Sequence, residues 1–446
     1  MKKYLFTLVC LSISLHFVYA QKVDFEEMDL ENGLHVILHQ DNTAPVITVG
    51  FMADVGGKDA GGNNNPERTG FAHFYEHLLA SATTKNIKKG EWRKLRASRG
   101  GQGNANTSID RTYYYQTFPS NNLEFAIWMD SERLLHPIIN KDAVDTQNEV
   151  VKEEKRSTYD NRPYGQFLFV LSENLFEVHP YRYKNIGEME HLDAASVEEF
   201  QDYYDKYYVS NNLVLVVAGD IDIPETKKLI KKYYSAIPKG EKIVRDFPKE
   251  KPIIQSKKIT TYDPNIQIPG IIVAYRTPGF KERDAYIFNM VSAYLSDGKT
   301  SKLYKKIVDD KKMALQIGAL NIEQKDYSMY AIYGLPSGDI PLEDLLTEID
   351  EEIVLMQNEL ISEKDYQKLQ NKFENRFVNS NSSVEGIANS LARYYLLYND
   401  VNLINDQINI YRSITREEIQ AAVKKFLNPN QRIIIDYLPE IKENKI

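Results

Sequence analysis

Short stretches in which apolar and polar residues alternate, or in which apolar residues run together, predict β-strands along the whole chain. Residues 34–39 alternate, whereas residues 213–220 form a continuous apolar run that ends in a turn. A period of two places one strand face in a core, and a continuous run is typical of a strand buried on both faces. The predicted strands cover residues 34–39, 46–55, 104–108, 112–118 and 213–220, and later 271–275, 314–321, 328–334 and 432–437.

Apolar residues three and four positions apart predict helices between these strands. In the first half, the predicted helices cover residues 70–79, 89–98, 122–135, 141–160 and a segment that ends near 236. In the second half, they cover residues 285–295, 301–308, 342–357, 363–377, 384–398 and 416–426. Both halves therefore run strands, helices, strands and helices, which predicts a duplicated α+β fold.

The boundary between the two halves is predicted at residues 239–258. This segment is rich in lysine, glutamate and proline and has no apolar period, as expected of a linker. A chain of 446 residues is also too long for one ordinary core. We therefore expect an N-terminal domain over residues 21–238 and a C-terminal domain over residues 259–446.

The first twenty residues have the pattern of a secretory signal peptide. Lys2 and Lys3 precede an apolar run that is short for a membrane span, and residues 18–20 fit a signal-peptidase site. We therefore expect export, either to the periplasm or to the exterior. Cleavage after residue 20 would remove Cys10, the only cysteine, and a lipid anchor on Cys10 is the alternative.

The composition adds two limits on function. Apolar residues make up 42% of the chain and charged residues 26%, which are values of a soluble globular protein. The formal net charge is −8 at pH 7, and an acidic chain is a poor binder of nucleic acid.

The helix predicted over residues 70–79, with Thr69 as its expected N-cap, carries the candidate chemistry. His73 and His77 are four residues apart, so both imidazoles lie on one helix face and can bind one metal ion. Glu76 can reach a water molecule on that metal. The order His-x-x-Glu-His inverts the commoner zinc-peptidase motif. The alternative is a surface helix with two incidental histidines.

The helix predicted over residues 141–160 offers a candidate third ligand. Val150, Val151 and Glu154 fall at helical spacing on one side, and a carboxylate on a buried side is costly unless it is paired or binds a metal. Glu153 fits better as a solvated charge. Most acidic runs of this kind are plain helix surfaces, so that interpretation stays open.

Residues 66–77 resemble the pitrilysin/insulinase family of inverted-motif zinc metallopeptidases, which includes the mitochondrial processing peptidases, and the resemblance covers nearly the whole mature chain. It implies two homologous domains, each an antiparallel or mixed sheet with helices packed on one face, of which the C-terminal one is inactive. The family's third ligand is the second glutamate of a Val-Val-x-Glu-Glu segment. The resemblance thus implies one zinc ion per chain, held by His73, His77 and Glu154, with Glu153 as the fallback.

Two further tracts are interpreted through the same resemblance. Residues 101–107 resemble the family's edge strand, so Asn104, Ala105 and Asn106 are expected to pair with the substrate backbone. Many members carry a supporting glutamate seven residues before the ligand glutamate. This position is Gln147 here, which can still hydrogen-bond behind the ligands.

The second half departs from the family at two important positions. Active members use an arginine and a tyrosine from a second-half domain to bind substrate and stabilise the oxyanion. Alignment of residues 303–315 places Val308 and Leu315 there, and neither donates a hydrogen bond. Arg393 and Tyr394 lie in the wrong predicted element. The resemblance therefore implies a related but non-identical partner subunit, because a homodimer would leave both roles empty.

The expected reaction is hydrolysis of peptide bonds in peptides or unfolded polypeptides. Zinc held by the three ligands would leave a fourth position for water. Glu76 would take a proton from that water as the general base and pass it to the leaving amine. The competing hypothesis is a non-catalytic, metal-stabilised binding or assembly subunit. The missing arginine and tyrosine favour it, although a scaffold need not keep a general base and three ligands.

Overall fold

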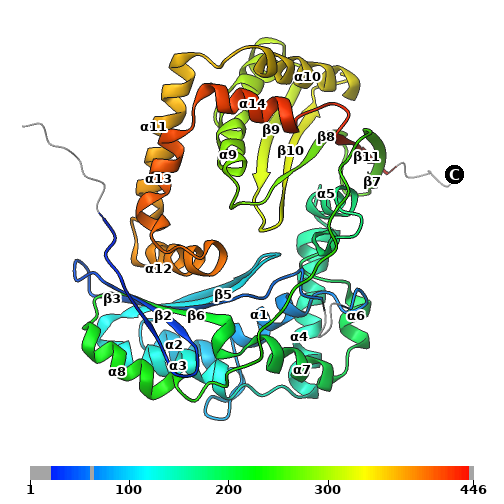
Figure 1. Cartoon of the computed structure of the whole chain (residues 1–446). Coiled ribbons are helices and arrows are strands. Elements are labelled where there is room, and N and C mark those ends of the chain that lie inside the picture. Colours follow the sequence, from blue (N-terminus) through cyan, green and yellow to red (C-terminus); the bar gives the residue numbers. More distant parts are fainter. Residues whose placement is uncertain (1–21, 61–64, 441–446) are drawn as a thin grey trace, which may run out of the picture.

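The structure is a computed structural model that describes residues 22–60 and 65–440, and the expected signal peptide lies outside these ranges. Figure 1 shows two sheets, one in the lower and one in the upper part of the view, each with its own helices. The strands are β1 (Glu26–Asp29), β2 (His35–Gln40), β3 (Val46–Ala53), β4 (Gln102–Thr107), β5 (Thr112–Pro119), β6 (Leu213–Gly219), β7 (Lys257–Asp263), β8 (Gly270–Pro278), β9 (Ala314–Ile322), β10 (Tyr327–Pro336) and β11 (Arg432–Pro439).

The helices connect these strands. The α-helices are α1 (Phe71–Ala80), α2 (Trp92–Ser98), α3 (Leu123–Leu135), α4 (Lys141–Glu154), α5 (Phe167–Leu175), α6 (Met189–Ala194), α7 (Val197–Tyr207), α8 (Ile223–Tyr234), α9 (Arg283–Ser296), α10 (Leu342–Asn358), α11 (Glu363–Ser380), α12 (Val384–Arg393), α13 (Leu403–Ser413) and α14 (Arg416–Phe426). Short helical segments are η1 (Ser120–Asn122), η2 (Lys155–Asp160), η3 (Pro180–Arg182), η4 (Ser210–Asn212), η5 (Tyr304–Asp310) and η6 (Tyr394–Tyr398). Across the described ranges, no helix combines the length and apolarity that crossing a bilayer requires.

The two sheets repeat one topology. The first has the order β1-β2-β6-β3-β5-β4 and the second the order β7-β11-β8-β10-β9. In each, the last strand along the chain inserts parallel to the first long strand and antiparallel to the next one. The duplication and the mixed sheets are therefore confirmed. The helices α1 and α9 occupy equivalent places before β4 and β9, but α9 contains no histidine.

One helix from each half also packs on the sheet of the other half. Helix α12 of the second half packs on β3 and β6 of the first sheet. Helix α5 of the first half packs on β8 and β10 of the second sheet (Figure 1). The apolar pattern predicted a helix at α12 but none at α5. It could not predict which sheet a helix covers, because an apolar helix face can pack on any apolar surface.

A buried polar cluster joins the turns of the two halves. Asp110, between β4 and β5, accepts hydrogen bonds from the Tyr181 hydroxyl at 2.8 Å and from the Lys325 backbone N–H at 2.9 Å. The Lys58 ammonium lies 3.3 Å from the same carboxylate. Lys325 belongs to the turn between β9 and β10, so this cluster fixes the second sheet against the first.

The segment predicted as a linker has no helix or strand from residue 238 to 256, and β7 begins at its last two residues. This segment is bound to the surface of the folded chain by side-chain hydrogen bonds. Arg245 donates to Asp59 at 2.6 Å and to Asp54 at 3.0 Å. Glu250 accepts from three successive backbone N–H groups, of which that of His179 is at 2.7 Å. The division into domains at 238 and 259 stays a prediction.

Candidate metal centre

The N-cap of helix α1 is Gly70 rather than the expected Thr69. Gly70 has φ 90°, and a Cβ there would lie 2.7 Å from the Ile186 carbonyl, so only glycine fits this start. The Thr69 hydroxyl instead lies 2.8 Å from Nδ1 of His191 and accepts from the Glu188 backbone at 3.1 Å. The prediction of a threonine cap is therefore wrong, because tertiary contacts use that side chain.

The apolar side of α1 packs into the first core and orients the motif. The Phe71 ring stacks on Phe200 of α7 and the Phe74 ring packs on it at a tilt, with ring centroids 4.6 and 4.2 Å away. The Tyr75 hydroxyl donates to the Phe200 carbonyl. These contacts fix the rotation of α1 about its axis. The opposite side of the helix then presents His73 and His77 toward the end of α4.

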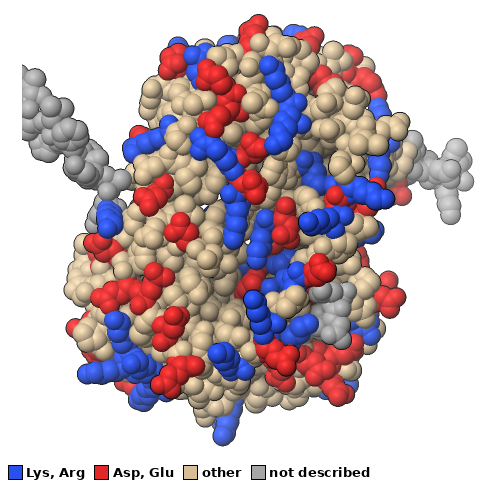
Figure 2. Space-filling model, in the orientation of Figure 1, with Lys and Arg blue, Asp and Glu red and all other residues tan. Residues whose placement is uncertain are grey.

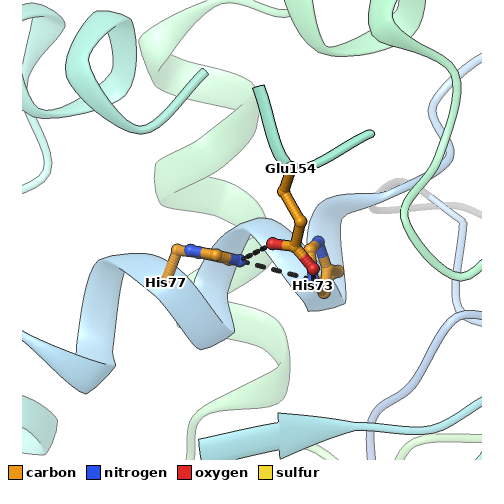
Figure 3. A group of neighbouring side chains, drawn as sticks. All are labelled: His73, His77 and Glu154. Carbon is orange, nitrogen blue, oxygen red and sulfur yellow. Dashed lines mark hydrogen bonds and ion pairs between the residues drawn. The ribbon is translucent and has the colours of Figure 1, made fainter. Parts of the chain in front are cut away.

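The structure brings His73, His77 and Glu154 together, as Figure 3 shows. The two Nε2 atoms are 3.3 Å apart. Nε2 of His77 lies 2.9 Å from Oε2 of Glu154, and Nε2 of His73 lies 3.6 Å from Oε1. Hydrogen bonding to His73 and then to His77 lowers the pKa of Glu154 well below its ordinary value, so this carboxyl is ionised at neutral pH.

These distances fit a zinc ion. Tetrahedral zinc with bonds of about 2.0–2.1 Å separates its ligand atoms by about 3.3–3.4 Å. The three separations above bracket that value, and the donor set of two imidazoles and one carboxylate is one that catalytic zinc uses. Nε2 of His73 is the nitrogen that lies near the other two donor atoms, and its Nδ1 is buried with no hydrogen-bond partner within the described chain.

The register of α4 separates the two candidate glutamates. Glu154 is its last residue and faces α1, whereas Glu153 points to solvent and pairs with Arg156 at 3.2 Å. Val151 is fully buried but Val150 is 45% exposed. The expectation that both valines share the buried side with Glu154 is therefore wrong for Val150, since the side that packs on α1 is narrower than assumed.

Glu76 precedes the ligand His77 directly in the chain. It is half-buried, and no side chain in the described ranges hydrogen-bonds or ion-pairs with it. Burial lowers the pKa of the Arg111 guanidinium to about 10, and the negative charge of Glu76 acts in the opposite direction. A carboxylate that no cation neutralises by contact is available to accept a proton from water.

The residues expected to bind substrate lie on β4, which is the edge strand of the first sheet and, among the described strands, pairs with β5 alone. Asn104 and Asn106 are exposed, whereas Ala105 is buried beneath the strand. Helix α1, which carries both histidines, packs against β4. The Arg111 guanidinium donates to the Asn106 carbonyl at 2.8 Å and holds one end of this strand.

Sequence analysis did not single out Arg111. It lies in the short turn between two predicted strands. Its charge, next to a strand expected to bind substrate, could have marked it as a candidate. Arg393 of α12 acts electrostatically on Arg111. Tyr394 is buried and donates to Gln407 at 2.9 Å, so the pair Arg393–Tyr394 does not act together at one site.

Within the described ranges, the remaining predicted positions form no hydrogen bond or ion pair with the two histidines. Gln147 lines a separate cavity of about 370 Å³ with Leu78, and it forms no hydrogen bond to His73 or His77 among the described residues. Val308 packs against the second core from η5, and Leu315 is 56% exposed on β9. Within the described chain, these two positions supply no donor to the centre.

Comparison with known proteins gives the family. The model of the insulinase family (peptidase family M16) matches residues 35–184, and that of the peptidase M16 inactive domain matches residues 194–373. The zinc protease PqqE of Helicobacter pylori is 25% identical over 97% of this chain and 96% of its own. The uncharacterized zinc protease YmxG of Bacillus subtilis is 22% identical over 91% of this chain and 96% of its own.

A solved structure agrees with these sequence matches. The crystal structure of a protease from Helicobacter pylori superposes with a TM-score of 0.86 at 25% identity, over 93% of this chain and 99% of that one. The first family model spans both histidines, Glu76 and Glu154, and the second spans most of the half that lacks them. On these grounds the chain belongs to the insulinase family, peptidase family M16, and has the length of that family's short bacterial members.

Proposed function

We propose that this chain is a zinc endopeptidase that cleaves peptides or unfolded polypeptides. The observation that carries the proposal is the geometry of three donor atoms at tetrahedral separations, next to Glu76, a carboxylate with no hydrogen-bond or ion-pair partner in the described ranges. His73, His77 and Glu154 would hold one zinc ion. Relatives named zinc proteases support the same metal.

The chain's own residues account for the remaining steps. Zinc bound there would supply a Lewis acid for the scissile carbonyl and a lowered pKa for the attacking water. Glu76 accepts a proton from that water as it attacks, and then gives it to the nitrogen of the leaving amine. The buried aromatic contacts of α1 keep Glu76 and the two histidines in fixed relation while the proton moves.

Substrate would bind as an added strand on the free edge of β4. Main-chain hydrogen bonds along Asn104, Ala105 and Asn106 supply affinity that depends little on side chains. Arg111 positions this edge through the Asn106 carbonyl. We also propose export of the chain, on the pattern of residues 1–20, and a related partner subunit that supplies the arginine and tyrosine absent at Val308 and Leu315.

Replacement of the general base tests the reaction. Glu76→Gln should keep stoichiometric zinc and lower kcat by about 100- to 10,000-fold, the contribution of one general acid–base group. The matched control is Glu198→Gln, an exposed carboxylate on α7 that should leave kcat unchanged. The measurement is cleavage of a mixed peptide pool by zinc-assayed protein. Cleavage that survives Glu76→Gln would contradict the assignment.

A second function has a specific observation in its favour. Residues 194–373 match an inactive-domain model, and the side chains of Val308 and Leu315 lack hydrogen-bond donors. Such a chain could be a metal-stabilised binding or assembly subunit that cleaves nothing. Full zinc content with no cleavage, even in the presence of a partner that carries the arginine and tyrosine, would favour this function over the peptidase.

A further inference from the structure

A cavity of about 550 Å³ lies in the second half of the chain, between α9, the edge strand β9 and the helices α11 and α13. Figure 1 shows these elements in the upper part of the view. Because α9 and β9 correspond to α1 and β4, the cavity lies beside the counterpart of the histidine-bearing helix. Its volume is within the range of pockets that bind small molecules. Within the described ranges, no histidine lines it and no group of metal ligands forms in it.

The strand β9 is bonded to α9 along one side of the cavity. The hydroxyl groups of Ser292 and Ser296 donate to the Ala319 carbonyl at 2.7 and 2.9 Å. A carbonyl oxygen has two lone pairs, so these two bonds leave it no capacity for a further donor. A peptide therefore could not pair with β9 at Ala319 as it would with the open edge of β4, and we expect a different class of ligand in the cavity.

The cavity has a free hydrogen-bond acceptor, Oδ1 of Asn321. This atom is buried and has no hydrogen-bond partner within the described residues. The amide is held in one orientation, because its Nδ2 donates to Oδ1 of Asn289 at 3.0 Å and to the Ala285 carbonyl at 3.4 Å. A buried acceptor without a partner costs free energy, and a ligand that donates a hydrogen bond to Asn321 would recover it.

The cavity also has a free donor, the hydroxyl hydrogen of Tyr411. The hydroxyl oxygen accepts from Nδ2 of Asn289 at 3.0 Å, and its own hydrogen has no acceptor within the described chain. The Tyr411 ring stacks on Phe373 with centroids 4.3 Å apart, which fixes its position. Asn289 thus contacts both Tyr411 and Asn321, and it holds a donor and an acceptor at a fixed separation.

The charged groups at the cavity neutralise one another. Asp297 forms ion pairs with Arg376 and Lys372, and of these three residues Asp297 and Arg376 line the cavity. The remaining lining side chains are amides, hydroxyls, aromatic rings and aliphatic groups, and the Phe377 ring among them is half-buried. A charged ligand would meet no unpaired opposite charge among the described lining residues, so the cavity favours a neutral polar ligand.

We propose that this cavity binds a neutral carbohydrate of one or two sugar rings. Each sugar hydroxyl both donates and accepts, so the hydroxyls of one ring can accept from Tyr411 and donate to Asn321. The apolar C–H face of the ring would pack on the open part of the Phe377 ring. The site lies outside the candidate metal centre, and it adds a carbohydrate-binding function that does not depend on peptide cleavage.

Calorimetry on the purified chain tests the proposal. The ligands are glucose, galactose, N-acetylglucosamine and maltose, and the comparison ligand is N-acetylglycinamide, a neutral amide without hydroxyl groups. At least one sugar should bind with a Kd of about 1 mM or tighter. The amide should bind at least about 10-fold more weakly than that sugar, since it leaves part of the polar lining without partners.

Two variants assign the binding to this cavity. Tyr411→Phe removes the free donor but keeps the ring on Phe373, and it should weaken sugar binding by about 10-fold. Ser380→Trp places a large ring at an exposed lining position, where folding does not depend on the side chain, and it should abolish sugar binding. The matched controls are Tyr366→Phe and Ser382→Trp, at positions that do not line the cavity, and both should leave the affinity unchanged.

Three results would overturn the proposal. They are the absence of sugar binding at a ligand concentration of about 10 mM, sugar binding that Tyr411→Phe and Ser380→Trp both leave intact, and an amide that binds as tightly as the best sugar. The assay contains no peptide, so its outcome is independent of the proposed cleavage. Sugar binding that both cavity variants weaken, in a chain that cleaves no peptide, would support this site and count against the peptidase function alone.

Discussion

At the scale of single residues, the neighbours Glu153 and Glu154 show how a position on a helix decides a chemical role. Only Glu154 faces the histidines, whereas the Glu153 side chain is 71% exposed. Helical spacing already favoured Glu154 over Glu153, although it left open that the whole run is a plain helix surface. The family resemblance favoured Glu154 through its register, and the orientation of α4 explains that register in space.

This difference predicts opposite outcomes for the two matched variants. Loss of a hydrogen-bonding residue behind a metal ligand costs about 10- to 100-fold in affinity, so Glu154→Gln should weaken zinc binding by at least about 100-fold. Glu153→Gln should leave zinc affinity unchanged, since it removes only a surface pair with Arg156. Competition with a chelator measures both. Equal zinc affinity in the two variants would contradict the proposed ligand set.

At the scale of elements, the hydrophobic pattern predicted the buried strands better than the exposed ones. The continuous run in β6 and the alternation in β2 identified both strands. The hydrophobic pattern did not predict β1 and β7, because both are edge strands with most side chains exposed, and they are short or largely polar. The open edge of β4 was expected only through the family resemblance, since strand order depends on pairing between distant segments.

The edge position of β4 predicts how substrate backbone should matter. An added strand directs alternate amides toward β4, so N-methylation at every second residue near the scissile bond should lower kcat/KM by about 10-fold or more. The intervening residues should tolerate the methyl group. Steady-state cleavage of an N-methyl scan of one good substrate measures this. If kcat/KM falls to the same extent at successive positions, rather than at every second one, the peptide does not pair with β4.

At the scale of the whole molecule, the duplication could be predicted from the rhythm of elements, but the exchange of α5 and α12 between the halves could not. Nor could the cluster around Asp110 that fixes the two turns, because its members are far apart in sequence. Figure 2 shows acidic and basic side chains interspersed over the visible face, with no broad area of one sign there. Recognition of a polypeptide by backbone and apolar groups suits such a face better than recognition of a polyanion.

The incomplete second half leads to a prediction about assembly. Val308 and Leu315 offer no donor for a developing oxyanion, and removal of one such donor typically lowers kcat by about 100- to 1,000-fold. The isolated chain should therefore hold one zinc ion and cleave slowly. A tagged chain recovered from its own cells should carry a related, non-identical subunit, identified by mass spectrometry, and adding that subunit should raise kcat by the same factor. A complex assembled with Glu76→Gln serves as the control and should stay inactive. If the isolated chain already cleaves at a rate that the added subunit does not change, its own groups, with Arg111 the first candidate, complete the site.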